Sequence, residues 1–361
     1  MPSDESDVAA GARNLLLNCA QAKPGERLLI VCERPDLGLY GAGLPEAVSA
    51  TALELGLHVA VQEVAFEPSV DALPADLAKK LAGADHAVFF ARLGDQLRFR
   101  AMPKGARPIV SYALDTDMLG SRFGTADYRA FVALKKAFDQ TLARASDIHV
   151  TCPLGTDLRG SARPEAGEEP ADTSILRFPM SVFSPLKARS FAGRVAVARF
   201  LVGTGSNYYE PYGVPLAETI FAEIGDGRIQ RFSGREDEVQ RAYRHYEHVG
   251  GLFGIDPYAI HSWHAGIHPG CSYAMPAEAN FERWSCGAFG NPRLLHFHTC
   301  GDYAPGEICW NLVDATITCD GLPVLSAGIL KLEHIDNTGP ILKGYPGLSA
   351  VFEHPRQEIG L

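Results

Sequence analysis

Several histidines of this chain are spaced as metal ligands often are. His296 and His298 are separated by one residue in an apolar, strand-like segment. Residues i and i+2 of a β-strand project from the same face, so both imidazoles would enter one space. His264 and His268 lie in a second, glycine-rich segment, and in extended backbone they too would share a side. Imidazole is the commonest protein ligand for mid-row divalent metals. The pattern therefore predicts that histidines of the 264–298 stretch hold a metal ion.

Two carboxylates follow these histidines closely. Asp302 or Glu307 could complete a face of two histidines and one carboxylate, the arrangement favoured by non-haem Fe(II) oxygenases. The alternative for each is a turn residue or a solvated charge, and Asp302 follows Gly301, which is common turn chemistry. The pattern leaves open whether the site has three histidines or includes a carboxylate.

Strand and helix signals alternate through the first 150 residues. Apolar runs predict strands at 27–32, 58–65, 85–91 and 108–114, and helical periodicity predicts helices at 44–55, 76–82 and 129–145. This alternation is typical of a mostly parallel sheet with helices on both faces. We therefore expect an N-terminal, doubly wound α/β domain over residues 1–185. A dinucleotide site is not supported, because no G-x-G-x-x-G motif follows the first strand.

The pattern changes after a polar segment at 155–173, which is rich in glycine, proline and acid and reads as a loop or domain connection. Strands are predicted at 195–202 and 219–224 and a helix at 236–246, followed by many short strands and turns. We expect a C-terminal α+β domain over residues 186–361, with a mixed or antiparallel sheet that carries the metal site.

Composition limits the classes of partner and compartment. A chain of 361 residues has the size of two domains. Its formal charge of −10 disfavours binding to nucleic acid or to an anionic membrane. The first seven residues lack the pattern of a secretory signal, and no apolar run is long enough to span a bilayer. The eight cysteines form no C-x-x-C pair and read as reduced thiols, so a cytoplasmic protein is expected.

Longer segments of the second half suggest a family. They are GTDLRG at 155–160, AETIFAEIGDGRIQRFSG at 217–234, HAGIHP at 264–269, ANFERWSCGAFGNP at 279–292, LLHFH at 294–298 and DATITCDGLPVLSAG at 314–328. Through them the second half resembles the 2,5-dihydroxypyridine 5,6-dioxygenases, which are related to the aminopeptidase T metallopeptidases. The first half is similar only in its α/β character and in the strand that follows Gly25.

The resemblance implies a mononuclear non-haem Fe(II) enzyme that uses O2 to cleave a hydroxylated pyridine or a similar small hydroxylated aromatic ring in extradiol fashion. In that family one iron ligand matches His264, and the other two form an H-x-D pair that matches residues 296–298. This chain has His298 where the family has aspartate. Either the site has three histidines, or Asp302 or Glu307 supplies the carboxylate. Three neutral histidines would leave Fe(II) with its full +2 charge and favour a dianionic, bidentate oxygen chelator.

Four further residues are predicted to support this chemistry. His268 and Tyr303 are candidate catalytic residues, His268 as an acid or base and Tyr303 as a hydrogen-bond donor to a bound oxygen. Tyr273 and Arg177 are candidate substrate-binding residues. Arg177 lies in the region where the resembling enzymes contact substrate, and an arginine there could clamp a carboxylate through two parallel N–H bonds. The alternatives are packing for the tyrosines, a structural hydrogen bond for His268 and surface exposure for Arg177. A homo-oligomer is expected from the resemblance and from its general frequency.

Two other functions compete with the dioxygenase. An aminopeptidase T-like aminopeptidase or amidohydrolase would use a pair of metals to activate water, and Pro305-Gly306-Glu307 is similar to an element of those peptidases. Such sites also need aspartate and a second glutamate, which the sequence does not offer in the required pattern. A non-catalytic small-molecule binding protein is disfavoured by the number of clustered histidines.

Overall fold

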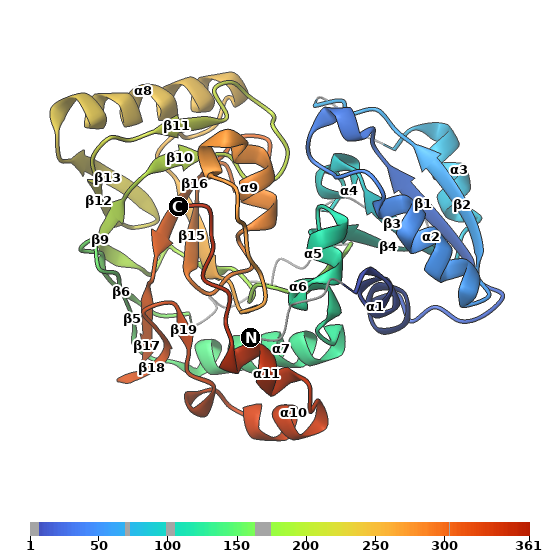
Figure 1. Ribbon diagram of the computed structural model, residues 1–361. Helices are drawn as coiled ribbons and strands as arrows, with labels where there is room; N and C mark the ends of the chain where they lie inside the picture. Colours follow the sequence, from blue (N-terminus) through green and yellow to red (C-terminus); the bar gives the residue numbers. More distant parts are fainter. Residues whose placement is uncertain (1–6, 69–72, 99–104, 163–174, 303) are drawn as a thin grey trace.

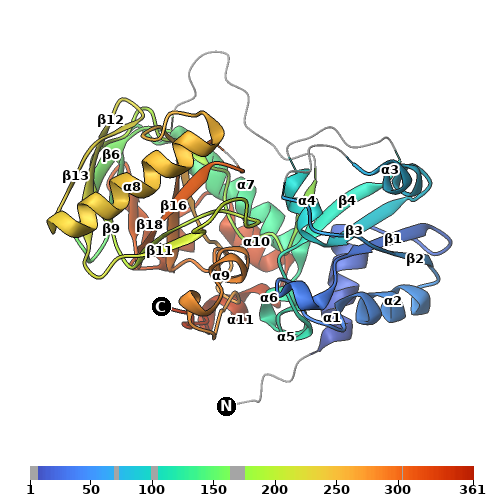
Figure 2. The same cartoon turned by 90° about the horizontal axis from the view of Figure 1, so that it is seen from above.

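The computed structural model describes residues 7–68, 73–98, 105–162, 175–302 and 304–361. The chain forms two bodies that lie side by side (Figure 1), a smaller one around β1–β4 and a larger one that carries α8 and β15. Figure 2 shows the same two bodies from above. Among the described residues, no helix has both the length and the apolar character that crossing a bilayer requires.

The smaller body is built on a parallel sheet of five strands in the order β2-β1-β3-β4-β7. These are β1 (Arg27–Cys32), β2 (His58–Glu63), β3 (His86–Phe90), β4 (Arg107–Ser111) and β7 (Leu176–Phe178). One face packs on α1 (Val8–Arg13), the π-helical turn Asn14–Cys19 and α2 (Leu44–Glu54); the other packs on α3 (Ala75–Ala82) and α4 (Arg92–Gln96). Central strand β3 is buried along its whole length because helices cover both faces. The predicted doubly wound α/β domain is confirmed.

The larger body contains two antiparallel sheets. The six-stranded sheet has the order β11-β10-β16-β15-β14-β8, with β8 (Leu186–Lys187), β10 (Phe200–Val202), β11 (Gly213–Pro215), β14 (Ile260–Ala265), β15 (Leu294–Cys300) and β16 (Glu307–Val313). The eight-stranded sheet has the order β13-β12-β9-β6-β5-β17-β18-β19, with β5 (Ile148–Thr151), β6 (Asp157–Gly160), β9 (Ala192–Val197), β12 (Ile220–Gly225), β13 (Arg228–Ser233), β17 (Thr316–Cys319), β18 (Leu322–Ser326) and β19 (Ile329–Leu330). Both sheets and α8 (Glu236–Phe253) contribute to one apolar core. The predicted α+β half with an antiparallel sheet is confirmed.

The chain passes between the two bodies more than once. Strands β5 and β6 precede residue 185 but pair in the eight-stranded sheet, and β7 then returns to the parallel sheet. Helix α7 (Tyr128–Arg144) contributes Phe131 to the core of the smaller body and Phe138 to that of the larger. Strands that precede residue 185 thus belong to the sheets of both bodies. The division of the chain into two domains at residue 185 remains a prediction.

Short helices complete the fold. They are α5 (Thr116–Gly120), α6 (Arg122–Thr125), α9 (Phe281–Gly287), α10 (Thr338–Gly344) and α11 (Leu348–Glu353), with 3-10 turns at Pro35–Leu37, Ala277–Ala279 and Leu332–His334. Leu348 and Val351 of α11 join the core of the smaller body, although they come from the end of the chain.

The largest differences from the predicted limits concern one strand and one helix. The strand expected at 195–202 is divided into β9 and β10, because Arg199 adopts a left-handed backbone with φ of 71°. The helix expected at 236–246 continues to Phe253 and ends where Gly254 adopts the left-handed cap conformation. Glycines 250 and 251 therefore do not end the helix, despite their low helix propensity.

Candidate metal centre

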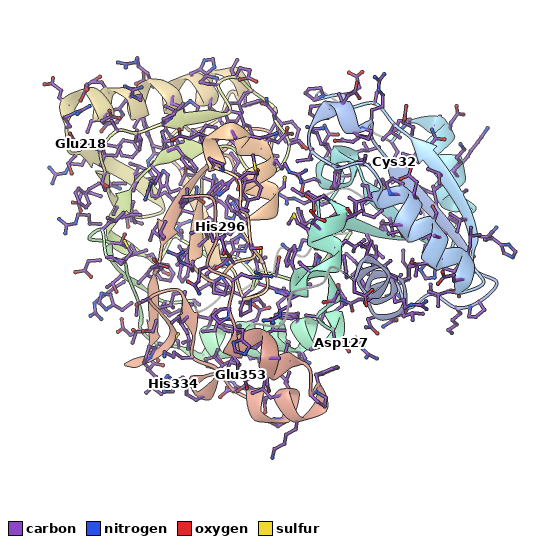
Figure 3. All side chains as sticks on the ribbon, viewed as in Figure 1. Cys32, Asp127, Glu218, His296, His334 and Glu353 are labelled. Atoms are coloured by element: carbon purple, nitrogen blue, oxygen red, sulfur yellow. The ribbon has the colours of Figure 1, made fainter. Side chains whose placement is uncertain are left out.

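Strand register brings three histidines to one face of the six-stranded sheet. In the antiparallel pair β14–β15, His264 lies directly opposite His296, and Ser262 lies opposite His298. Opposite residues share a face, and His296 and His298 share it by their spacing of two. One potential ligand nitrogen from each ring lies within 4.8 Å of those of the other two. Figure 3 labels His296 within the larger body, close to α9. The predicted convergence of residues 264, 296 and 298 is thus present in the structure.

Each ring is held by a different contact. His264 Nδ1 donates to the carbonyl oxygen of Phe183 at 3.0 Å. His298 Nδ1 donates to a carboxylate oxygen of Glu307. The ring of His296 stacks on Phe289, with centroids 4.2 Å apart and planes at 23°. Because a carbonyl and a carboxylate only accept, Nδ1 carries the proton in both rings, and a neutral ring then offers the lone pair of Nε2.

The electrostatic surroundings keep two of these rings neutral. Burial lowers the pKa of His264 well below its ordinary value, and the nearby His296 and His298 lower it further. Burial also lowers the pKa of His296 well below its ordinary value, with smaller contributions from His298 and Arg177. Neutral imidazole is the form that binds metals.

The centre also contains buried nitrogen atoms that lack a partner. Within the described parts of the chain, Nδ1 of His296 and Nε2 of His298 are buried without a hydrogen-bond partner. Leaving such a group unsatisfied costs about 1–3 kcal/mol, and a bound cation would satisfy it. A set of three imidazole nitrogens fits a mid-row divalent metal ion.

The two candidate carboxylates take different places, and neither belongs to the three-histidine group. Asp302 is half-exposed, with Oδ1 3.7 Å from Nδ1 of His261. His261 itself donates from Nε2 to the carbonyl oxygen of Cys300 at 2.9 Å. Glu307 is buried and orients His298 from behind, as carboxylates commonly do for metal-binding histidines. The geometry therefore favours a three-histidine ligand set with Glu307 as its support.

Replacing Glu307 with glutamine should weaken metal binding without abolishing it. Glu307→Gln keeps the side-chain size but removes the charged acceptor that fixes the ring of His298. Loss of such a partner typically lowers metal affinity about 10- to 100-fold. Competition with a chromophoric chelator measures this change. Asp302→Asn is the matched control and should bind metal as the wild type does; equal affinities for all three proteins would contradict the assigned role of Glu307.

His268 lies outside the three-histidine group. Strand β14 ends at Ala265, so the chain does not continue extended as far as His268. The fully buried ring of His268 stacks on the ring of Phe131, with centroids 3.8 Å apart, and contacts the ring of Phe123 edge-on, with centroids 5.0 Å apart. Its Nδ1 accepts from the backbone N–H of Gly270 at 3.2 Å. The structure thus favours the alternative of a packed histidine with a structural hydrogen bond, and a catalytic role for His268 stays an untested prediction.

This buried histidine should make the protein less stable in acid. Burial lowers the pKa of His268 from its ordinary 6.5 to about 3. Between these values the unfolded chain binds a proton that the folded chain refuses, so stability falls as the pH falls below 6.5. From pH 7 to pH 5 the loss is about 2 kcal/mol for this one group. Urea unfolding of metal-free protein at both pH values should show His268→Gln losing less free energy of unfolding than the wild type, and an identical loss would refute the prediction.

The other predicted residues are placed as follows. Tyr273 is buried in a small apolar cluster with Trp284, Phe289 and Ile359, so packing accounts for its position. Tyr303 lies outside the described residues. Arg177 lies on β7, and its charge contributes to the lowered pKa of both His264 and His296, which places it within electrostatic reach of the centre.

One buried polar cluster was missed in the sequence. Asp95, Arg98 and Tyr112 form a hydrogen-bonded cluster beyond the carboxyl ends of β3 and β4. Ligand sites of open parallel sheets lie beyond the carboxyl ends of the strands. In the sequence, the carboxyl ends of the predicted strands 85–91 and 108–114 could have indicated the position of this cluster.

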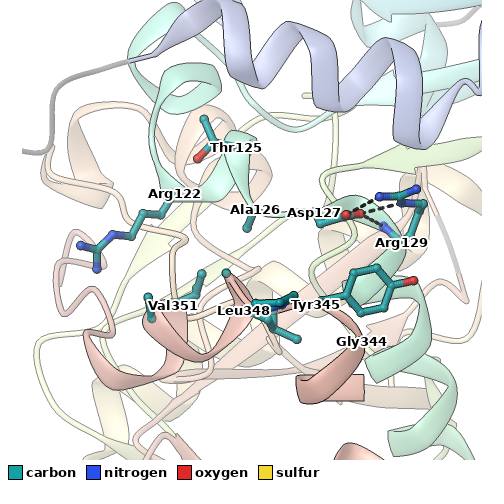
Figure 4. Close-up of a pocket in the computed structure, with 12 residues that line it drawn as sticks. Arg122, Thr125, Ala126, Asp127, Arg129, Gly344, Tyr345, Leu348 and Val351 are labelled. Atoms are coloured by element: carbon teal, nitrogen blue, oxygen red, sulfur yellow. Dashed lines mark hydrogen bonds and ion pairs between the residues drawn. The ribbon is translucent and has the colours of Figure 1, made fainter. Parts of the chain in front are cut away.

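A surface groove lies elsewhere, between the start of α7 and the segment from α10 to α11 (Figure 4). Within it, Arg129 and Asp127 form an ion pair at 2.6 Å. The residues that line this groove include none of the predicted site residues, so we assign it no function.

The fold and the centre together define a class of architecture, a doubly wound parallel-sheet body joined to an antiparallel body with a three-histidine face. Among solved structures, the 2,5-dihydroxypyridine dioxygenase from Pseudomonas putida KT2440 is similar, with a TM-score of 0.56 and 13% identity over 89% of this chain and 96% of that chain. The wild-type AmpT from Thermus thermophilus has a TM-score of 0.47 and 13% identity over 90% of this chain and 98% of that chain. No protein-family model and no curated protein matches the sequence. The likeness to the dioxygenase shows the fold, and it agrees with the resemblance found in the sequence.

Proposed function

We propose that this protein is a mononuclear Fe(II) dioxygenase that cleaves a hydroxylated pyridine or a similar small hydroxylated aromatic ring. The observation that carries the proposal is the group of three buried histidines, His264, His296 and His298, with ligand nitrogens within 4.8 Å of one another. A bound iron(II) ion would supply the Lewis-acid and redox chemistry of ring cleavage by O2. In that reaction both oxygen atoms enter the product and one ring bond breaks, so no external reductant is needed.

The surrounding residues have distinct parts in this proposal. Phe183 and Glu307 fix two of the ligand rings, so the centre is preorganised. All three ligand histidines are buried, which keeps bulk water away from reactive intermediates. Arg177 places a positive charge near the centre, where it would attract an anionic substrate. A small aromatic substrate and O2 are thus the proposed partners, and a homo-oligomer stays an expectation.

The ligand set favours one metal over two. Paired-metal hydrolases hold their ions through shared carboxylates, whereas the metal-ligating group found in the described residues contains histidines alone. Glu307, the nearest predicted acid, is engaged by His298.

Anaerobic purification followed by metal analysis tests the proposal. One iron per chain, together with O2 uptake on addition of 2,5-dihydroxypyridine or catechol, is expected. Incubation under 18O2 should place both labelled atoms in the ring-opened product. Two zinc or cobalt ions per chain and release of amino groups from peptides would replace the dioxygenase with a metallohydrolase.

A further inference from the structure

The histidine face of the six-stranded sheet carries one further polar side chain, that of Asn311. In the antiparallel pair β15–β16, Asn311 lies directly opposite His296, and on the other side of β15 His264 lies opposite the same residue. The three residues form one row across neighbouring strands, so their side chains share a face. Directly opposite residues have Cβ atoms about 4.5–5.5 Å apart, so the amide of Asn311 lies beside the ring of His296.

The amide of Asn311 is buried and its donor is unused. Only 5% of the residue is exposed. Among the residues that the structure describes, none accepts a hydrogen bond from the buried Nδ2 atom. Buried polar groups in folded proteins almost always have a partner. An unused donor therefore indicates a partner that the chain itself does not supply.

A neighbouring thiol fixes the direction of this amide. Cys309 lies opposite His298 on the same face, and its Sγ donates weakly to Oδ1 of Asn311 at 3.9 Å. Burial raises the pKa of Cys309 well above its ordinary value, so the thiol stays protonated and remains a donor. Because Oδ1 accepts from the thiol, Nδ2 is the end of the amide that is left for an exogenous group.

The unused atoms of this face need two different partners. Nδ1 of His296 and Nε2 of His298 are also buried without a partner in the described part of the chain, and a cation would satisfy their lone pairs. The N–H groups of Asn311 only donate, so a cation cannot satisfy them. They need an acceptor. A negatively charged oxygen atom bound to the metal ion would supply one, and three neutral histidines leave the charge of a divalent ion to be balanced by such an atom.

We infer that Asn311 donates a hydrogen bond from Nδ2 to an ionised oxygen atom of the exogenous ligand at the metal centre of His264, His296 and His298. The ligand class is an anionic oxygen donor, such as the ionised hydroxyl group of a chelating aromatic ring. The inference rests on the proposed function and adds the residue that recognises the bound oxygen. Asn311 thus contacts the substrate itself, whereas Glu307 orients a ligand ring.

Binding of 4-nitrocatechol to zinc-loaded protein tests this inference. Zinc(II) does not react with O2, so binding is measured without turnover, and the visible band of the probe reports the surroundings of its oxygen atoms. Asn311→Leu keeps a branched side chain without N–H groups, and Asn311→Ala removes the amide altogether. Both variants should retain the zinc content of the wild type and bind the probe at least about tenfold more weakly, because a hydrogen bond to a charged group is strong in a buried site.

The band of the bound probe separates recognition from structure. A donor stabilises the negative charge on the probe's oxygen atom in the ground state, so its loss should shift the band to longer wavelength. Asn291→Ala is the matched control. Asn291 is also buried, but its Nδ2 donates to the carbonyl oxygens of Cys271 at 2.7 Å and Arg356 at 3.1 Å. This variant should lower the melting temperature and leave the affinity and the band of the probe unchanged.

An unchanged affinity or an unchanged band in either Asn311 variant would overturn the inference. Loss of zinc from these variants would also overturn it, since Asn311 would then serve the metal ion and not its ligand, and so would a wild type that does not bind 4-nitrocatechol. Failure of the proposed function is recognised separately, as an iron-loaded protein that consumes no O2, because the zinc-loaded protein reports on Asn311 without that chemistry.

Discussion

Replacing His296 with alanine (His296→Ala) is expected to give a folded protein that retains no metal ion. Only histidines contribute to the ligand group identified in the described residues, so replacing any one of them with alanine removes one of the three ligands. The nearest predicted carboxylate, Glu307, is held by His298 and is not placed to substitute. His264→Ala should have the same effect, because His264 lies directly opposite His296 on the neighbouring strand.

Metal analysis after anaerobic reconstitution with iron(II) measures this loss, and circular dichroism checks that the variants fold. His261→Ala is the matched control. His261 lies on β14, as His264 does, but its ring is hydrogen-bonded to the carbonyl oxygen of Cys300. It should retain the iron content of the wild type. Full iron content in His264→Ala or His296→Ala would show that the ligand assignment is wrong.

Local patterns were sufficient to predict much of the fold and one part of the centre. The strand Arg27–Cys32 and the helix that begins at Leu44 depend on hydrophobic periodicity, which neighbouring residues determine. The shared face of His296 and His298 follows from a spacing of two on a strand, again a local property. These features needed no knowledge of distant contacts.

Features that depend on distant contacts could not be predicted in the same way. His268 shares a glycine-rich segment with His264, but its ring is captured by Phe123 and Phe131, more than 130 residues earlier in the chain. Strand β5 follows the alternating elements of the first half in the sequence, yet it pairs with β17 from the far end of the chain. Arg98 carries no motif, and only the fold brings it to Tyr112, which follows a different strand.

The contact between the two bodies depends on a buried ion-pair network around Arg92. Sheets with this type of strand order have a crevice between the ends of β1 and β3, where ligands often bind. Here Glu33 follows β1 and Arg92 follows β3, and Nη1 of Arg92 donates to Glu33. From the larger body, Glu282 of α9 accepts from Nε of Arg92 at 2.6 Å and from Nη2 at 2.8 Å. The network thus lies at this position and links α4 to α9 of the larger body.

Arg92→Met is therefore expected to destabilise the protein by about 3–5 kcal/mol, because it leaves the buried Glu33 and the partly buried Glu282 without their cation. Urea unfolding measures the free energy of unfolding.

Arg34→Met, which breaks an exposed ion pair with Asp36, is the control and should cost at most about 1 kcal/mol. Adding Glu33→Gln and Glu282→Gln to Arg92→Met should restore part of the stability, since the neutral amides no longer need a cation. The Arg92→Met protein should still bind metal, because the three histidines lie on β14 and β15 of the larger body. A variant as stable as Arg34→Met would show that this network does not hold the two bodies together.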